Sequence, residues 1–304
     1  MALAQSEYTP LLWRTDLLLE RHYGWTLVQA TDLAKILSKN QGPLRKYMAL
    51  SRGEAPDRFE ALIRPCIEDR RAIVVYHDLT ASGPAQEPTL GGKRFALCDD
   101  SSRLYNIATF VVDLDLDEEK LWAAFGNKSR NMVRRGTEHG LSVAISEKPG
   151  VQELGDFFGL YRPMAKRLGL AMPPESLLKG MSERGELASV TCRTSSDVVA
   201  VNLVFVAAPH AMYSYGARRT GSSDSGQLMQ WETIRYLKTK GVRWYDLGGI
   251  PSKILSGGIY DFKKSLGGEF VDLGWEYQYV SPLIYFPYKW YKRSKSLLAA
   301  YAPD

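Results

Sequence analysis

The order of apolar and polar residues predicts a mixed helix and strand protein whose pattern becomes regular after about residue 107. Short β-branched and apolar runs predict buried strands at 72–76, 107–116, 141–145, 187–193, 197–206, 211–217 and 243–247. Apolar residues at helical spacing predict helices at 118–138, 152–168, 175–185 and 227–240. Residues 1 to about 60 are expected to be mostly helical, because Leu33, Ile36 and Leu37 fall at helical spacing.

The succession of these elements predicts the fold class. Helices are followed by an antiparallel meander over 187–217, a glycine- and serine-rich loop at 220–226, a helix and a further strand. This is the element order of GNAT acyltransferases, and it favours an α+β fold over a doubly wound parallel sheet. The region 80–92, rich in Gly, Pro, Ser and Thr, is expected to be a loop.

Three separated segments resemble one family. GVRWYDLGGIPSKILSGGIYDFKKSLGGEFVDL (241–273) resembles the tyrosine-aspartate strand, Gly-Gly turn and G-[IL]-Y-x-F-K motif of the FemABX aminoacyl-tRNA-dependent peptidyltransferases. FVVDLDLDEEKLWAAFGNKSRNMVRRGTEHGLSV (110–143) and LYRPMAKRLGL (160–170) are similar to family segments in the same order. The resemblance covers about residues 107–280, and it implies a tandem GNAT-like fold. Its first domain, 1–107, would be reduced and completed by 275–304, and its second, 108–274, would be complete.

The resemblance implies a reaction as well as a fold. A Fem-type enzyme moves an amino acid from aminoacyl-tRNA to an amine of a peptide acceptor, here most simply a UDP-linked or lipid-linked peptidoglycan precursor. The first hundred residues depart from the family pattern in the acceptor region. A small peptide of a natural-product pathway therefore stays open as a second acceptor.

The chemistry of this reaction requires few catalytic groups. An aminoacyl ester is already activated, so the protein must mainly hold an amine against the carbonyl and stabilise the developing oxyanion. A lysine beside apolar neighbours is a suitable donor, because a low dielectric constant strengthens its attraction for negative charge. The family motif assigns this role to Lys263, whereas the adjacent Lys264 is expected to be a solvated surface residue.

Five further residues are candidates for substrate binding. Tyr260 and Phe262 either shape the acyl pocket and stack on the terminal adenine, as the resemblance implies, or are ordinary core aromatics. Arg167 occupies the family's arginine position and is a candidate for acceptor phosphates, against a surface ion pair. Tyr215 either binds substrate or packs at the end of a strand. Asp246 either orients an amine or accepts hydrogen bonds from a strand-end turn.

Clustered positive charge points to a polyanionic partner. The net charge is only +5, but Lys128, Arg130, Arg134 and Arg135 gather on one predicted helix and are candidates for tRNA phosphates. On that helix Lys128 and Arg135 fall near one face, and Arg130 and Arg134 on another. The tail at 281–295 interleaves aromatic residues with Lys289, Lys292, Arg293 and Lys295, which suits RNA or peripheral membrane contact. Solvated charged faces are the competing interpretation.

Other classes of site and function receive little support. The three cysteines are widely spaced and the four histidines isolated, so neither a metal site nor a disulfide framework is predicted, and no cofactor is expected. The longest apolar run is too short to cross a bilayer, and the N-terminus lacks the features of a secretory signal, so a cytoplasmic location is expected.

Two alternatives to the Fem-type reaction stay open. An acyl-CoA N-acyltransferase is the first, because Arg218, Gly221 and Ser223 nearly match a pyrophosphate-binding loop. The loop also contains an aspartate, Asp224, which does not suit an anion site. The second alternative is a binding module for tRNA or polysaccharide on a degenerate GNAT scaffold.

Overall fold

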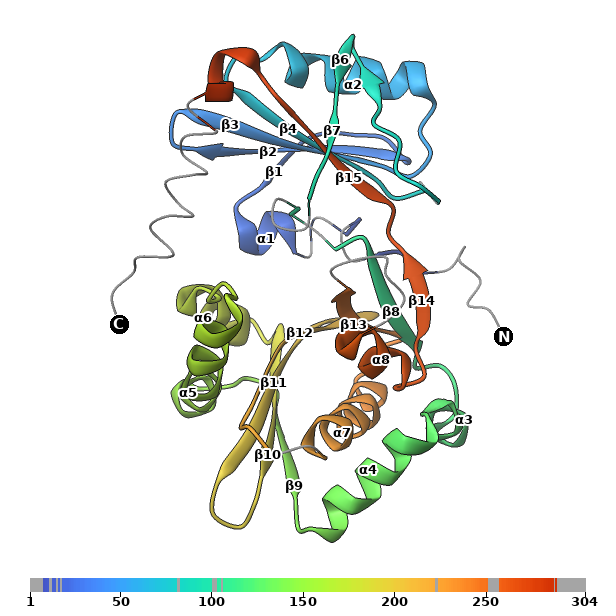
Figure 1. Ribbon diagram of the computed structural model, residues 1–304, viewed down its shortest axis with the longest axis vertical. Coiled ribbons are helices and arrows are strands. Elements are labelled where there is room, and N and C mark those ends of the chain that lie inside the picture. Colours follow the sequence, from blue (N-terminus) through green and yellow to red (C-terminus); the bar gives the residue numbers. More distant parts are fainter. Residues whose placement is uncertain are drawn as a thin grey trace. The chain divides into compact units, whose positions relative to one another are not determined.

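The computed structural model describes residues 8–10, 13–14, 16, 18–80, 83–99, 103–104, 106–221, 224–250, 257–286 and 288. The chain divides into two compact units, drawn in Figure 1. The larger unit comprises Met1–Thr9 and Ala108–Val271, and the smaller unit comprises Pro10–Ile107 and Asp272–Asp304. The chain thus starts in the larger unit, builds most of the smaller one, returns, and ends in the smaller unit.

A seven-stranded sheet forms the centre of the larger unit. Its strand order is β14-β8-β13-β12-β11-β10-β9. The strands are β8 (Ala108–Asp113), β9 (Ser142–Ser146), β10 (Leu187–Arg193), β11 (Val198–Ala207), β12 (His210–Arg218), β13 (Trp244–Ile250) and β14 (Glu269–Asp272). β12 and β13 are parallel, whereas β13 with β8 and the successive pairs from β9 to β12 are antiparallel. The antiparallel meander expected over 187–217 is therefore confirmed.

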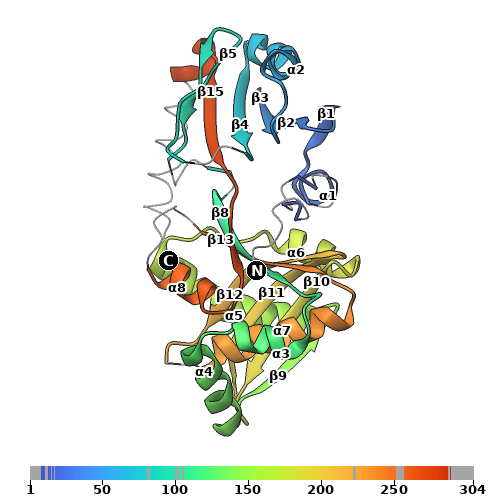
Figure 2. The ribbon, with the colours of Figure 1, turned by 90° about the vertical axis from the view of Figure 1, so that its right-hand side faces the viewer.

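Helices cover both faces of this sheet (Figures 1 and 2). They are α3 (Glu118–Ala124), α4 (Asn127–Glu138), α5 (Val151–Leu168), α6 (Glu175–Glu183), α7 (Ser225–Thr239) and α8 (Gly258–Lys264). α7 packs on β9, β10 and β11 and against α4, while α5 lies on β10, β11 and β12. The largest apolar core lies on the α7 face, where Phe125, Ile234 and Tyr245 are almost fully buried. Burial of such large side chains supplies the main driving force for this packing.

The single helix expected at 118–138 is wrong, because the chain forms two helices separated at Phe125 and Gly126. The guanidinium group of Arg130 donates to the carbonyl oxygens of Phe125 (2.6 Å), Ala123 (2.9 Å) and Trp122 (3.3 Å). These carbonyls lie at the C-terminal end of α3, and that of Trp122 also accepts from the backbone N–H of Phe125 at 3.2 Å. A side chain of α4 thus completes the end of α3 and fixes the break.

The smaller unit contains a six-stranded sheet in the order β1-β2-β3-β4-β15-β7. Its elements are α1 (Leu19–Tyr23), β1 (Thr26–Ala30), β2 (Ala34–Gln41), β3 (Leu44–Ser51), α2 (Pro56–Glu68), β4 (Ala72–Asp78), β5 (Thr89–Leu90), β6 (Lys93–Arg94), β7 (Ala96–Leu97) and β15 (Trp275–Val280). α2 connects the parallel strands β3 and β4 and packs Phe59 and Ile63 against Ile36 and Val74. β15 is antiparallel to β4 and β7, so the end of the described chain completes the sheet.

The helical prediction for residues 1–60 is wrong, since β1, β2 and β3 lie there. In β2 the adjacent residues Ile36 and Leu37 are both buried on opposite faces of the sheet. Ile36 packs in the core beneath α2, and Leu37 packs with Trp13, Trp25 and neighbours on the other face. A strand buried on both faces loses the alternation that identifies strands, and its apolar residues then match a helical spacing.

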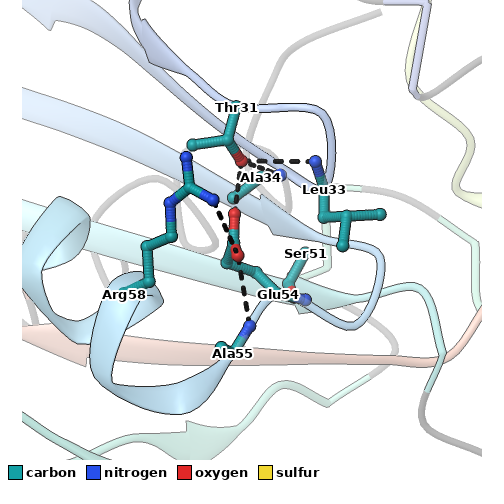
Figure 3. A network of polar contacts seen from close by, with 7 residues as sticks. All are labelled: Thr31, Leu33, Ala34, Ser51, Glu54, Ala55 and Arg58. Atoms are coloured by element: carbon teal, nitrogen blue, oxygen red, sulfur yellow. Dashed lines mark hydrogen bonds and ion pairs between the residues drawn. The ribbon is translucent and has the colours of Figure 1, made fainter.

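A polar network ties the start of α2 to the turn between β1 and β2 (Figure 3). The Thr31 hydroxyl donates to the Glu54 carboxylate (2.5 Å) and accepts from the backbone N–H of Ala34 (2.9 Å). Glu54 also accepts from the N–H of Ala55 (3.2 Å), and Arg58 lies 4.0 Å from it. The buried carboxylate is therefore satisfied by groups from two connections, which holds the β1–β2 turn against the sheet.

Candidate active site

Lys263 is a buried lysine at the end of α8. Only 7% of its surface is exposed. Its Nζ donates to the carbonyl oxygens of Gly248 (2.6 Å) and Gly249 (2.8 Å), near the end of β13. An ammonium group has three N–H donors, and no acceptor for the third lies among the described residues. Among the described residues, Lys263 thus uses two of its three donors.

The carboxylate of Asp246 organises the backbone that meets Lys263. Its Oδ1 accepts from the N–H of Gly248 (2.8 Å) and contacts the hydroxyl of Thr109, which also lies 2.9 Å from the Gly248 carbonyl oxygen. Its Oδ2 accepts from the Tyr8 hydroxyl at 3.0 Å. The backbone hydrogen bond considered for Asp246 is present, since Oδ1 accepts from the Gly248 N–H, and its role in orienting an amine stays a prediction.

Burial opposes the charged forms of both groups. It lowers the pKa of Lys263 to about 8, and the negative charge of Asp246 acts in the opposite direction. Burial also raises the pKa of Asp246, while Thr109, the Gly248 N–H, Lys263 and Tyr8 act to lower it. At neutral pH most Lys263 side chains are therefore still protonated. A cation in such a dry place attracts nearby negative charge more strongly than a cation in water does.

The backbone conformation at the glycine pair accompanies a break in the regular pairing of β13 with its neighbouring strands. β12 pairs with β13 only from His210 opposite Trp244 to Met212 opposite Asp246, and the register with β8 shifts between Asp246 and Gly249. Gly248 has a φ of +79°, and a Cβ there would lie 2.6 Å from the Tyr213 carbonyl oxygen. Only glycine fits this conformation and this close approach. The result is a bulge within β13, the Gly248–Gly249 turn, which presents two successive carbonyls to Lys263.

The two aromatic residues of the motif lie at the same helix. Tyr260 is buried, and its ring centroid lies 5.3 Å from that of Phe110. Phe262 is half-buried beside Gly226 at the start of α7, where a Cβ would lie 3.6 Å from the Phe262 ring. Lys264 is exposed, with its Nζ 5.7 Å from the Tyr260 centroid. The half-buried ring of Phe262 is thus the better placed of the two for contact with a ligand.

Arg167 and Tyr215 belong to the α5 face of the sheet. Tyr215 lies inside β12, not at its end as expected, and follows a bulge in the pairing with β11. Its ring centroid is 6.1 Å from Phe157 and 6.0 Å from Tyr161, both on α5. Arg167 is exposed in the last turn of the same helix. The packing role considered for Tyr215 is therefore present in the structure.

The four basic candidates on α4 differ in their surroundings. Lys128 is exposed, and Arg130 is engaged with the end of α3. Arg134 is exposed with its guanidinium 5.8 Å from the Trp122 centroid. Arg135 donates to the buried Asp224 carboxylate at 2.7 Å. Arg134 also donates to the exposed Asn131 Oδ1 at 3.1 Å, so Lys128 and Arg134 are the two of this group whose side chains lie at the surface.

Two residues of the site were not found from the sequence. Thr109 interrupts an apolar run, IATFVVD, and a polar residue inside a buried strand was a usable signal. Tyr8 is 238 residues away from Asp246, and nothing in the local pattern indicates the pairing. The basic tail residues Lys289, Lys292, Arg293 and Lys295, and Ser223 of the loop, lie outside the described residues.

Residues 126–264, which lie within the larger unit, match the family model described as Acetyltransferase (GNAT) domain. A search of curated proteins finds no match.

Solved structures extend the likeness to most of the chain. FemX matches with a TM-score of 0.63 at 16% identity, over 94% of this chain and 98% of that chain. The C-terminal domain of a putative lysylphosphatidylglycerol synthetase from Agrobacterium fabrum matches with a TM-score of 0.53 at 14% identity, over 92% and 90%. A conserved protein of unknown function from Bacteroides thetaiotaomicron gives 0.52 at 14%, over 84% and 86%. These likenesses confirm the α+β, tandem GNAT-like fold, and at such identities they show the fold alone.

No described helix is long and apolar enough to cross a membrane. In the part of the chain that the structure describes, no group of His, Cys, Asp and Glu side chains is arranged to hold a metal ion.

Replacing Gly248 with alanine should disrupt the site. The new Cβ would meet the Tyr213 carbonyl at 2.6 Å in a backbone conformation that disfavours side chains. We expect a loss of stability of about 2 kcal/mol or more, from strain and displacement of the turn, measured as a lower thermal midpoint. Gly241→Ala is the matched control, because Gly241 also has positive φ (+68°) but nothing within 4 Å of its Cβ position. Equal losses in the two variants would contradict the importance of the close approach.

Proposed function

We propose that this protein is an aminoacyltransferase that moves an amino acid from aminoacyl-tRNA to an amine of a peptide acceptor. The acceptor is most simply a UDP-linked or lipid-linked peptidoglycan precursor. The observation that carries the proposal is the buried, charged Lys263, held at the Gly248–Gly249 turn with one N–H still available. The Fem-type motif around it and the fold shared with FemX support the same proposal.

The arrangement suits an ester that is already activated. The acceptor amine attacks the ester carbonyl, a C–N bond forms, and the carbonyl oxygen gains negative charge that the third N–H of Lys263 stabilises. The C–O bond to the terminal ribose then breaks, and the proton lost by the amine goes to the departing ribose oxygen. No nucleophilic side chain is required, because orientation and charge stabilisation supply the rate enhancement.

The start of α7 favours tRNA over acyl-CoA as the donor. A CoA pyrophosphate would require free backbone N–H groups and a positive potential at this helix start. Instead, the N-cap residue Asp224 places a buried carboxylate there, paired with Arg135 at 2.7 Å. Arg135 is therefore engaged by this carboxylate and is not free to bind a second anion at the same helix end. This argues against an acyl-CoA N-acyltransferase, although the family model that matches the domain is named for acetyltransferases.

The donor and acceptor can be identified in one assay. Purified protein is mixed with radiolabelled aminoacyl-tRNAs, or with radiolabelled acetyl-CoA, and with UDP-linked or lipid-linked peptidoglycan precursor as acceptor. We expect label to move to the acceptor from at least one charged tRNA and not from acetyl-CoA. A parallel arm with free peptides tests the natural-product acceptor. Transfer from acetyl-CoA alone would contradict the proposal, and tRNA binding without any transfer would indicate a binding module.

Lys263→Met should abolish turnover while leaving the fold intact. Methionine keeps the length and apolar stem of the side chain but removes the ammonium group. We expect a loss in kcat of about 100-fold or more, the usual cost of removing one donor to an oxyanion. Lys264→Met is the matched control, because Lys264 is the next residue and exposed. Comparable tRNA affinity and thermal midpoint in both variants would show that the loss is chemical. A fully active Lys263→Met protein would remove the catalytic assignment.

The transfer rate should fall as the pH rises through about 8. Burial places the pKa of Lys263 at about 8, so the charged donor is present below this pH and is lost above it. The acceptor amine titrates as well, but in the opposite sense, because it attacks only when neutral. Acceptors whose amine pKa lies well below 8 separate the two effects, because their amine is already neutral where Lys263 loses its proton, and the fall through pH 8 is expected for these acceptors. The alkaline limb should stay in place while the acid limb moves with the amine. A rate that keeps rising through pH 8 to 9 would indicate that neutral Lys263 acts as a base.

A further inference from the structure

The N-terminal segment contributes a buried tyrosine to the larger unit. Tyr8 is 4% exposed, and its ring lies edge-on to Trp244 (5.7 Å between centroids) and His210 (6.1 Å). Together with Val111 and Trp244 it forms a small apolar cluster on the face of the sheet away from α7. This residue precedes the whole of the smaller unit in the sequence, yet it packs in the larger one.

The Tyr8 hydroxyl has a specific partner in the candidate active site. It donates to Asp246 Oδ2 at 3.0 Å, while the other oxygen, Oδ1, is engaged by Thr109 and by the N–H of Gly248. The carboxylate is therefore held from both sides. If the carboxyl group could rotate, its hydrogen bond from the Gly248 N–H would weaken. The Gly248–Gly249 turn, whose carbonyls accept from Lys263, would then be held less firmly.

We propose that Tyr8 is a positioning residue, which holds the Asp246 carboxylate so that the Gly248–Gly249 turn and Lys263 keep the geometry that aminoacyl transfer requires. The activity part of this inference rests on the proposed function. The structural part, the coupling between Tyr8 and Asp246, stands without it. A segment at the start of the chain would then be needed for catalysis in a domain that begins about 100 residues later.

Several titratable groups surround Asp246. Lys263 approaches from α8, Tyr245 is its neighbour on β13, and Tyr8 faces it from the N-terminal segment with the ring of His210 beside Tyr8. Tyr8 stabilises the ionised carboxylate by donating to it, and Lys263 stabilises it by its charge. Loss of the Tyr8 hydroxyl removes one of the groups that hold the pKa of Asp246 down. The pKa of this carboxyl should therefore rise.

Tyr8→Phe tests the proposal, because it removes only the hydroxyl and keeps the ring that packs on Trp244. Tyr47→Phe is the matched control. The Tyr47 hydroxyl also donates to an aspartate, Asp69 Oδ2, at 3.0 Å, but in the smaller unit. Asp246 should produce a second acid limb, below the one set by the acceptor amine. We expect this lower limb to move up by about one pH unit in Tyr8→Phe, with about a tenfold loss of kcat on it. The KM for aminoacyl-tRNA should be unchanged, and Tyr47→Phe should follow the wild-type profile.

A second measurement does not depend on activity. Carboxyl 13C NMR of protein labelled at aspartate, with the Asp246 signal assigned from Asp246→Asn, reports the titration of Asp246 directly. We expect it to titrate at higher pH in Tyr8→Phe than in wild type or Tyr47→Phe. An unchanged Asp246 titration would overturn the inference, as would a kcat loss that is uniform across pH. If wild-type protein transfers nothing from any tRNA, the proposed function fails, and the NMR titration still decides whether Tyr8 and Asp246 are coupled.

Discussion

The larger unit is organised around one costly interaction, a lysine ammonium group buried at the end of a central strand. An ion removed from water must be stabilised by nearby charges and dipoles in place of its hydration, or it becomes neutral. For Lys263 this stabilisation comes from the carbonyls of Gly248 and Gly249 and from the negative charge of Asp246. The compensation is incomplete, as the lowered pKa shows. In the proposed reaction, a substrate oxygen that develops negative charge would supply the stabilisation that the protein groups leave incomplete.

The sheet topology makes this interaction possible. In a continuous ladder, the carbonyls of β13 would be used by neighbouring strands. Here the parallel pairing with β12 extends only as far as Asp246, and the pairing with β8 is irregular at the glycines. The carbonyls of Gly248 and Gly249 accept hydrogen bonds from Lys263 at the end of α8. Thr109 on β8 and Asp246 on β13 also hold the backbone at Gly248.

Part of the fold and of the candidate site could be predicted from the sequence, and the parts that could not be predicted have physical causes. The meander β10–β12 and helices α5 and α7 were predicted closely, because each has a local apolar pattern bounded by glycine or polar turns. Lys263, singled out by a motif of residues close in sequence, is buried against two carbonyls of the same motif, and its catalytic role stays a prediction. The strands of the smaller unit were predicted as helices, because Ile36 and Leu37 are buried on opposite faces. Arg130 and Tyr8 act through contacts with other elements, which no local pattern encodes.

The charges at the start of α7 bear on which donor the protein selects. The N-terminal end of α7 is a place where a GNAT domain can bind phosphate through the helix dipole and free N–H groups. In this chain a buried aspartate at that helix start already supplies the negative charge, and Arg135 neutralises it. Phosphates of a donor would therefore have to be recognised elsewhere. Exposed cations such as Lys128 and Arg134 are spread along α4, an arrangement that suits an extended polyanion better than a compact pyrophosphate. The internal ion pair and the open basic surface thus favour a nucleic acid carrier, whose contacts can be distributed over a longer path.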